Sequence, residues 1–491
     1  MKVVKFGGSS VASAAQIKKV AEIVVADPER CVVVVSAPGR RNKRDAKVTD
    51  MLIELARAGI AGGDTEAPLQ RIAARFAEIA KGLKLHAEIL EPIVEDLRAR
   101  LAGLSTNDAP TANRVGVPTA KKAVPTATKA GAAKGSLSEE AYLDNLKAAG
   151  EDHTARIVAA YLRKLGHDAH YVNPKDAGLI LSDEPGHARV LTSSYGKLHK
   201  SLRRHPGIVV FPGFFGYSES GRVVTFSRGG SDITGAILAA AIEASVYENF
   251  TDVDSVYACD PRIVPNPLGV REITYREMRE LSYAGFSVFH DEALEPVFHA
   301  GIPVNVRNTN NPSAPGTLIV PKRDAGEMPI VGIAATSGFC SIFVSKYLMN
   351  REVGFGRRVL HILEDEGVPF EHIPTGIDNM SVVMRESRFG PATEERVTRR
   401  IRQELIPDEI SVERDLALVM VVGEGMRHMI GIAGRACSGF ANAGVNLEMI
   451  NQGSSEVSMM FGIKAKDATA SVRALYNDLI AGRKRARKNP R

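Results

Sequence analysis

The chain has 491 residues, of which 44% are hydrophobic, 24% charged and 6% aromatic. This length suggests about three domains, and the apolar fraction is that of an ordinary folded protein. The longest apolar runs, such as Cys31–Val35, are far shorter than the roughly 20 residues that cross a bilayer. The spacing of the four cysteines indicates neither a disulfide framework nor a zinc site and fits a reducing compartment. We therefore expect a cytoplasmic protein with no membrane partner.

The formal net charge of +6 is concentrated in two segments. Six cations lie in residues 483–491 and five in residues 109–135, and neither segment contains an acid. Without these segments the remaining chain is net acidic. We predict a disordered basic tail at 483–491 and no specific binding of nucleic acid.

Residues 1 to about 325 alternate between strand and helix patterns. Ser13 and Gln16 have the spacing of a capping box, and Ile17, Val20 and Val24 then form one apolar helix face. Strands are predicted at residues 3–6, 31–35, 207–211, 223–226 and 245–251, and a further helix at 234–244. Repetition of strand, glycine-rich turn and helix indicates a layered α/β domain with a mainly parallel sheet.

Two segments separate the halves of this predicted domain. Residues 68–101 have a helical pattern, whereas residues 105–136 nearly lack large apolar side chains. Such a segment cannot bury enough surface to offset the entropy of ordering it. We predict a mobile insertion at 105–136.

After residue 330 the chain repeats itself. Residues 367–376 realign with residues 444–453 at a fixed offset, and Glu371 and Glu448 are one of several identical pairs. Each copy has the pattern of strand, helix, two strands and helix, which predicts strands at 341–347 and 416–422 and helices at 357–366, 393–405, 428–443 and 469–480. A paired module that binds a small ligand is the prediction, and duplication of a purely structural domain is the alternative.

The first chemical motif is Lys5-Phe-Gly-Gly-Ser-Ser-Val11, at the end of the first strand. Two glycines let the backbone approach an anion closely, and a helix that begins there offers N–H groups and a positive dipole end. Lys5 can reach the same anion as a point charge. Taken alone, the motif is equally consistent with a tight turn and a surface lysine.

Two further motifs follow strands in the second half of the domain. Residues 225–232 place Arg228 and Asp232 beside another predicted helix start, with Ser231 as a possible cap. Arginine suits bidentate recognition of a carboxylate, and aspartate can accept from an ammonium group or orient a lysine. Residues 251–262 combine polar, aromatic and cationic groups that suit a nucleotide.

These three motifs, in this order, resemble the signatures of the aspartate kinases in the amino-acid kinase superfamily. The C-terminal repeat is similar to their pair of ACT domains. The resemblance implies a three-layer αβα sandwich with a mainly parallel sheet at residues 1–325, followed by two ferredoxin-like βαββαβ ACT domains at 330–410 and 411–482. It also implies ATP-dependent phosphorylation of L-aspartate to 4-phospho-L-aspartate, with Mg²⁺, in lysine, threonine and methionine biosynthesis.

The resemblance also implies roles for individual residues. Lys5 would stabilise the transferring phosphoryl group, Arg228 would bind an aspartate carboxylate, and Asp232 would lie near the amino group or order Lys5. The implied aspartate-binding residues are Ser36, Thr49, Glu151, Arg228 and Ser231, and the implied nucleotide contacts are Gly7, Gly8, Ser9, Thr251, Asp252, Tyr257 and Arg262. No protein side chain is assigned to a metal. Without the resemblance, Ser36 and Thr49 would be interpreted as caps and Glu151 as a helix N-terminal acid.

One position departs from the family pattern. Many relatives carry a lysine that contacts the nucleotide phosphates in a segment that here reads Ala284–His290, and Ser287 stands in its place. We expect Arg262 or a cation within residues 40–47 to supply the missing charge. The alternatives are a catalytically impaired amino-acid sensor and a superfamily kinase with another carboxylate acceptor.

The first ACT copy carries the predicted effector site. Met349, Gly354, Phe355 and Glu371 match family effector positions. Backbone N–H groups near Gly354 suit a carboxylate, and Glu371 could pair with an ammonium group. We predict feedback inhibition by L-lysine, with L-threonine second, and a homodimer or homotetramer formed through the ACT domains.

Overall fold

The computed structural model describes residues 1–103, 137–286, 289, 291–326, 328–453 and 457–482. The predicted insertion at 105–136, Ser287 and the predicted tail at 483–491 lie outside the described residues. The chain forms two compact units: Met1–Asp254 with Glu292–Pro315, and Ser255–Asp291 with Gly316–Arg491. Residues 255–291 therefore cluster with the C-terminal region, although the sequence places them in the catalytic segment. The functional boundary at residue 325 stays a prediction.

The first unit is built on a parallel sheet in the order β3-β5-β2-β1-β8-β10. These strands are β3 (Ala169–Tyr171), β5 (Ile208–Pro212), β2 (Arg30–Val35), β1 (Lys2–Phe6), β8 (Val246–Thr251) and β10 (Val304–Asn308). Val32–Val35 are buried on both faces, as the continuous apolar run predicts for a sheet covered on each side. The predicted parallel sheet is confirmed.

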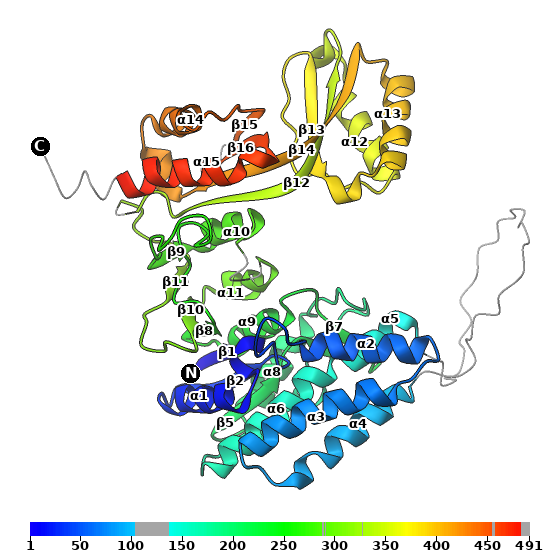
Figure 1. Cartoon of the computed structure of the whole chain (residues 1–491), viewed down its shortest axis with the longest axis vertical. Helices are drawn as coiled ribbons and strands as arrows, with labels where there is room; N and C mark the ends of the chain where they lie inside the picture. The colour runs from blue at the N-terminus through cyan, green and yellow to red at the C-terminus, as the bar shows by residue number, and fades with distance from the viewer. Residues whose placement is uncertain (104–136, 287–288, 290, 327, 454–456, 483–491) are drawn as a thin grey trace, which may run out of the picture. The chain divides into compact units, whose positions relative to one another are not determined.

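Helices cover both faces of this sheet (Figure 1). Val4 and Phe6 of β1 join the core formed with α1 (Ala14–Val25) and α6 (Ala149–Lys164). Lys5 points to the opposite face because side chains alternate along a strand, and α9 (Gly230–Ile242) packs there. The outer helices of the α6 side are α2 (Val48–Ile60), α3 (Glu66–Gly82), α4 (Glu91–Leu101) and α5 (Glu139–Lys147); α8 (Ser193–Leu202) and α11 (Leu294–Ala300) pack on α9. This is the predicted three-layer arrangement.

Several local predictions need correction. The strand predicted at 223–226 is β7 (Val223–Thr225), but it joins a separate small sheet with β4 (Ile180–Leu181) and β6 (Phe215–Ser218). The helix predicted from residue 234 begins at Gly230, because Gly229 adopts a left-handed conformation with φ of 81° and serves as its N-cap. The predicted cap by Ser231 is therefore wrong. Ser13 does cap α1, but the side-chain amide of Gln16 donates to Asn310 instead of completing the capping box.

The second unit contains β9 (Glu272–Thr274), α10 (Tyr275–Tyr283), a 3-10 turn η4 (Met349–Arg351) and β11 (Thr317–Val320), which pairs with β9. Its main sheet has the order β13-β12-β14-β16-β15, formed by β13 (Asn379–Arg385), β12 (Gly332–Ser345), β14 (Glu409–Val422), β16 (Ser458–Lys464) and β15 (Met449–Gln452). The helices of this region are α12 (Phe355–Asp365), α13 (Pro391–Leu405), α14 (Ile432–Asn442) and α15 (Ala468–Leu475). No helix in the described ranges is both long and apolar enough to span a membrane.

The two sequence copies share one sheet through two long strands (Figure 1). The strand predicted at 341–347 begins nine residues earlier, at Gly332, and its first half pairs with residues 417–422 of the second copy. Its second half pairs with β13 and with residues 409–413. Each copy therefore contributes a strand segment that pairs within the other copy's part of the sheet. The predicted domain boundaries, 330–410 and 411–482, describe the sequence repeat and stay predictions for the folded domains.

Candidate functional site

Lys5 and Asp232 meet at the centre of the parallel sheet. Lys5 is only 7% exposed, and its ammonium group forms an ion pair with Asp232 in the first turn of α9. The Asn249 side chain on β8 donates to Oδ1 of Asp232 at 2.8 Å, and the Tyr247 hydroxyl donates to its backbone carbonyl at 3.2 Å. The Asp232 carboxylate is thus fixed by β8 and holds the Lys5 ammonium in place.

The glycine turn after β1 lies directly against the turn after β2. The Gly7 N–H donates to the Phe250 carbonyl at 3.1 Å, and the Gly39 N–H donates to the Gly8 carbonyl at 2.8 Å. A Cβ on Gly39 would lie 2.7 Å from the Gly8 carbonyl carbon, so a side chain there would force the turns apart. The turn opens a short 3-10 helix, Gly8–Val11, and α1 begins only at Ala14, after its Ser13 cap.

Glu151 lies in the first turn of α6 and is 5% exposed. A Cβ on Gly150 would lie 2.7 Å from Cβ of Ala37, so only a glycine lets α6 approach the turn after β2 so closely. The Glu151 carboxylate accepts a hydrogen bond from the Ala37 N–H, but its Oε2 has no partner among the described residues. Burial raises the pKa of Glu151 to about 8, and the Ala37 amide and the Lys147 charge oppose this only in part. A buried carboxyl oxygen is left for a cationic ligand.

The other predicted acceptor-binding residues range from buried to exposed. Ser36 follows β2 and its N–H donates to the Phe6 carbonyl at 3.1 Å, while Thr49 is half-buried in the first turn of α2. Arg228 is exposed, and no ion pair joins it to another residue that the structure describes. Ser231 is 7% exposed, and Gly213 leaves room for it, since a Cβ there would lie 2.6 Å from its Oγ.

The carboxylate of Asp144 anchors the second motif and was not found from the sequence. This residue of α5 is 1% exposed and accepts hydrogen bonds from the N–H groups of Thr225 and Gly186, each at 2.8 Å. Lys147 lies 2.6 Å from Oδ1 of Asp144. Asp144 occupies an ordinary amphipathic helix with no motif around it, so no sequence signal could have identified it.

The predicted nucleotide contacts divide between the compact units. Thr251 and Asp252 belong to the first unit, where the Thr251 hydroxyl donates to Oδ1 of Asp252 at 3.2 Å. Tyr257 and Arg262 belong to the second unit. The Arg262 guanidinium is 90% exposed and lies 2.6 Å from Oδ2 of Asp260, so its charge can be redirected at small cost.

The predicted effector residues lie in the second unit but differ in their surroundings. Met349 and Phe355 are buried on either side of Gly354, which has φ of 81° and forms the N-cap of α12. Glu371 is already paired: its carboxylate accepts hydrogen bonds from the Tyr283 hydroxyl and from Nε of Arg385, the latter at 3.2 Å. Burial raises the pKa of Tyr283, and Glu371 raises it further.

Comparison with known proteins identifies the family. Residues 1–308 match the model of the amino acid kinase family, and residues 419–479 match that of an ACT domain. The chain is 53% identical over 482 residues to aspartokinase 3 of Bacillus subtilis, with 98% of this chain and 99% of that protein covered. The chain belongs to the aspartokinases. The predicted enzyme class, a kinase with a carboxylate acceptor, is thereby confirmed.

Solved aspartokinase structures have the same architecture. The aspartate kinase of Clostridium acetobutylicum matches with a TM-score of 0.79 and 35% identity, covering 97% of this chain and all of that one. E. coli aspartokinase III in complex with aspartate and ADP matches with a TM-score of 0.75 at 24% identity, covering 98% and 99% of the two chains, and shows the fold alone. The predicted fold class is confirmed.

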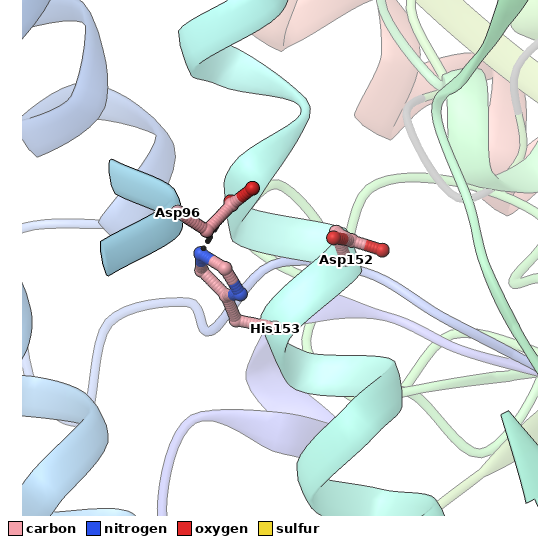
Figure 2. A group of neighbouring side chains, drawn as sticks. All are labelled: Asp96, Asp152 and His153. Carbon is pink, nitrogen blue, oxygen red and sulfur yellow. Dashed lines mark ion pairs between the residues drawn. The ribbon is translucent and has the colours of Figure 1, made fainter. Parts of the chain in front are cut away.

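One cluster in this aspartokinase has the composition of a metal site. Asp96, Asp152 and His153 place their ligand atoms within 4.8 Å of one another (Figure 2). However, Nε of Arg100 lies 2.7 Å from Oδ2 of Asp96, and its Nη2 lies 3.4 Å from Oδ2 of Asp152. A guanidinium therefore already supplies the positive charge between the carboxylates, and the cluster is a buried ion-pair network.

Proposed function

We propose that this aspartokinase transfers the γ-phosphoryl group of ATP to the side-chain carboxylate of L-aspartate, forming 4-phospho-L-aspartate as the first step toward lysine, threonine and methionine. Family membership supports the reaction. The observation that carries the assignment to this site is that two groups lie beside the adjoining turns: a buried ammonium at Lys5, oriented by Asp232, and a carboxyl oxygen of Glu151 with no partner among the described residues. Both groups flank the adjoining turns after β1 and β2.

Lys5 and the turn of Gly7, Gly8 and Ser9 hold the transferring phosphoryl group. Phosphoryl transfer needs mainly positioning and charge stabilisation, which an oriented ammonium and backbone N–H groups supply. Asp232 keeps the ammonium aimed by its ion pair. The acceptor carboxylate is ionised at neutral pH, so no general base is required. Mg²⁺ would accompany ATP and would supply positive charge at the phosphates, and no side chain of this chain is assigned to hold it.

Recognition of the acceptor uses opposite charges on two elements. Glu151 binds the amino group of aspartate through its free oxygen, and the exposed guanidinium of Arg228, which has no ion pair with another described residue, binds a carboxylate. Ser36, Thr49 and Ser231 provide hydroxyl groups around the same ligand. An acceptor that lacks either the amino group or the second carboxylate loses one of these charged contacts.

The nucleotide is held by Thr251, Asp252, Tyr257 and Arg262. The exposed Arg262–Asp260 pair is weak enough to release the guanidinium to a phosphate. Arg262 thus compensates for the lysine that Ser287 replaces. If Arg262→Ala leaves turnover and the KM for ATP unchanged, this compensation is wrong.

Regulation takes place in the ACT region. L-Lysine binds with its carboxylate at the Gly354 turn, between Met349 and Phe355, and its ammonium group at Glu371, with L-threonine as the second candidate. Because Glu371 is held by Tyr283 and Arg385, the effector must displace a donor from it. An effector inhibits only if it binds the less active conformation more tightly, and this exchange of partners provides the difference.

The working form is a homodimer or homotetramer, assembled through the ACT region in the cytoplasm. Val353 and Ile430 occupy equivalent positions of the two copies, each directly before a left-handed glycine, and both are almost wholly exposed. Exposed aliphatic side chains at matching positions favour an interface. A monomeric sedimentation coefficient at micromolar concentration would contradict this assembly.

Trapping the acyl phosphate as its hydroxamate tests the function. Mg-ATP is supplied with L-aspartate, N-acetyl-L-glutamate or L-glutamate, each alone, with L-lysine or with L-threonine. Turnover with aspartate alone, suppressed by lysine, is the expected result. Turnover with aspartate that only threonine suppresses would make threonine the effector and would leave the proposed kinase reaction unchanged. No turnover with aspartate would contradict the proposed reaction.

A further inference from the structure

We propose that Arg100 is a positioning residue for the acceptor site: its guanidinium holds the first turn of α6 and so aims the free oxygen of Glu151 at the amino group of aspartate. This inference rests on the proposed role of Glu151. Arg100 itself lies on α4 and does not touch the substrate.

One guanidinium joins three helices. The Arg100 side chain is 11% exposed, and its Nε donates to Oδ2 of Asp96 on its own helix at 2.7 Å. Its Nη1 donates to the backbone carbonyl of Asn145 on α5 at 2.7 Å, and its Nη2 contacts Oδ2 of Asp152 on α6 at 3.4 Å. Ion pairs on an exposed surface contribute little to stability, but the Arg100 guanidinium is largely shielded from water.

The contacted turn of α6 is unusual because it buries three consecutive ionisable residues. Glu151, Asp152 and His153 are 5%, 1% and 1% exposed, although acidic residues are rarely buried unless they are paired. Asp152 is paired through Arg100 and through the Tyr171 hydroxyl. Arg156 also contacts it at 3.4 Å, but that side chain is 45% exposed. Arg100 is therefore the main buried cation for this carboxylate.

His153 links the same turn of α6 to α4 by a second contact, with Asp96 (Figure 2). Its Nε2 lies 3.2 Å from Oδ2 of Asp96, and its ring meets Phe76 edge-on at 5.6 Å. Burial alone would raise the pKa of Asp96, but the His153 hydrogen bond and the Arg100 charge outweigh it and lower the pKa to about 2. Asp96 stays ionised, orients Arg100 on their shared helix α4, and ties His153 of α6 to α4.

Loss of Arg100 therefore acts on Glu151 through the helix backbone. Asp152 would be left buried without its main cation and would turn toward water, and adjacent residues of a helix cannot rotate independently. Glu151 is anchored to its surroundings only by the Ala37 amide among the described residues. A small rotation of this turn moves the free oxygen of Glu151 away from the amino group of the bound aspartate. Lys5 on β1 and the glycine turn after β1 stay in place.

The test compares Arg100→Met and Arg100→Lys with Arg98→Met, a control on the same helix whose side chain is 59% exposed and pairs with Glu66. The KM for aspartate, the KM for ATP and the Ki of succinate, which is aspartate without its amino group, are measured for each. Arg100→Met should raise the KM for aspartate by about tenfold, as expected for a weakened charge-assisted hydrogen bond. The KM for ATP and the Ki of succinate should stay unchanged, Arg100→Lys should recover part of the loss, and Arg98→Met should behave as the unmodified chain.

A purely structural role predicts a different pattern. If Arg100→Met weakens succinate and aspartate equally, or leaves both unchanged, the inference is overturned. Asp152→Asn removes charge from the same contact and is expected to give the same selective change, which covers the case in which Arg100→Met does not fold. If Glu151→Gln also fails to change the preference for aspartate over succinate, the proposed role of Glu151 fails instead.

Discussion

Glu151 and Glu371 are both expected to bind an ammonium group, yet their surroundings differ. Glu151 is buried in the kinase unit with one oxygen unpartnered, whereas Glu371 in the ACT region is already paired with Arg385 and Tyr283. A carboxylate with a free oxygen can receive a cation without rearrangement. One that is already paired must exchange partners before a ligand can bind.

This difference matches the task of each region. A substrate site gains from groups that are fixed before the ligand arrives, because less reorganisation accompanies the reaction. A regulatory site needs two arrangements of similar free energy, which the ligand can interconvert. Substitutions in the two regions test this contrast.

Lys5→Met removes the oriented ammonium from the kinase unit. We expect turnover to fall by about 10³-fold, the loss typical of a preorganised group that stabilises transition-state charge, with aspartate affinity little changed. Lys19→Met, on the exposed face of α1, is the control. Turnover within tenfold of the unmodified chain would exclude a catalytic role for Lys5.

Glu151→Gln keeps the shape of the acceptor site and removes the carboxylate that pairs with the amino group once aspartate is bound. We expect the KM for aspartate to rise by about 10- to 100-fold, since a hydrogen bond to a charged group contributes about 1.5–3 kcal/mol. Competitive inhibition by succinate should be retained. An unchanged KM would show that the free oxygen does not contact the substrate.

The raised pKa of Glu151 predicts how aspartate binding depends on pH. In the free protein a carboxyl with a pKa of about 8 is mostly protonated at neutral pH. Pairing with an ammonium group favours the ionised form and lowers the pKa in the complex. The KM for aspartate should therefore fall as the pH rises toward 8, by at most about tenfold per pH unit, and then level off. Glu151→Gln should abolish this slope, and a slope retained in that variant would assign it to another group.

Tyr283→Phe removes a donor from Glu371 in the ACT region. The effector then has less to displace, so the concentration of lysine that gives half inhibition should fall by about tenfold, the low end of the effect of a hydrogen bond to a charged group, about 1.5 kcal/mol. Glu371→Ala should have the opposite effect and abolish inhibition. Tyr347→Phe, whose ring is 75% exposed, serves as the control. Unaltered inhibition in both variants would place the effector elsewhere.

The sequence predicted those features that arise from local signals. Glycine turns after apolar strands drew attention to Lys5, at the end of β1, and to Asp232, in the first turn of α9, and the structure brings the two side chains together. The fixed offset of the repeat revealed two similar modules. These inferences need only neighbouring residues and the alternation of strands and helices.

Contacts between distant segments could not be predicted in this way. Arg100 meets Asp152 across 52 positions and Tyr283 meets Glu371 across 88, with no motif at either end. The first half of β12 pairs with the second repeat for the same reason: the strand pattern shows that it is a strand but not which partner it takes. The availability of a side chain depends on these contacts, so the sequence could not show that Glu151 keeps a free oxygen while Glu371 is already paired.

Calorimetric titration with L-aspartate at pH 7, in two buffers of different ionisation enthalpy, tests directly whether Glu151 receives the amino group. If Glu151 is protonated in the free protein and pairs with the amino group on binding, the difference between buffers should correspond to release of about one proton per bound aspartate. Glu151→Gln should release none. Aspartate binding without proton release in the unmodified chain would contradict the account.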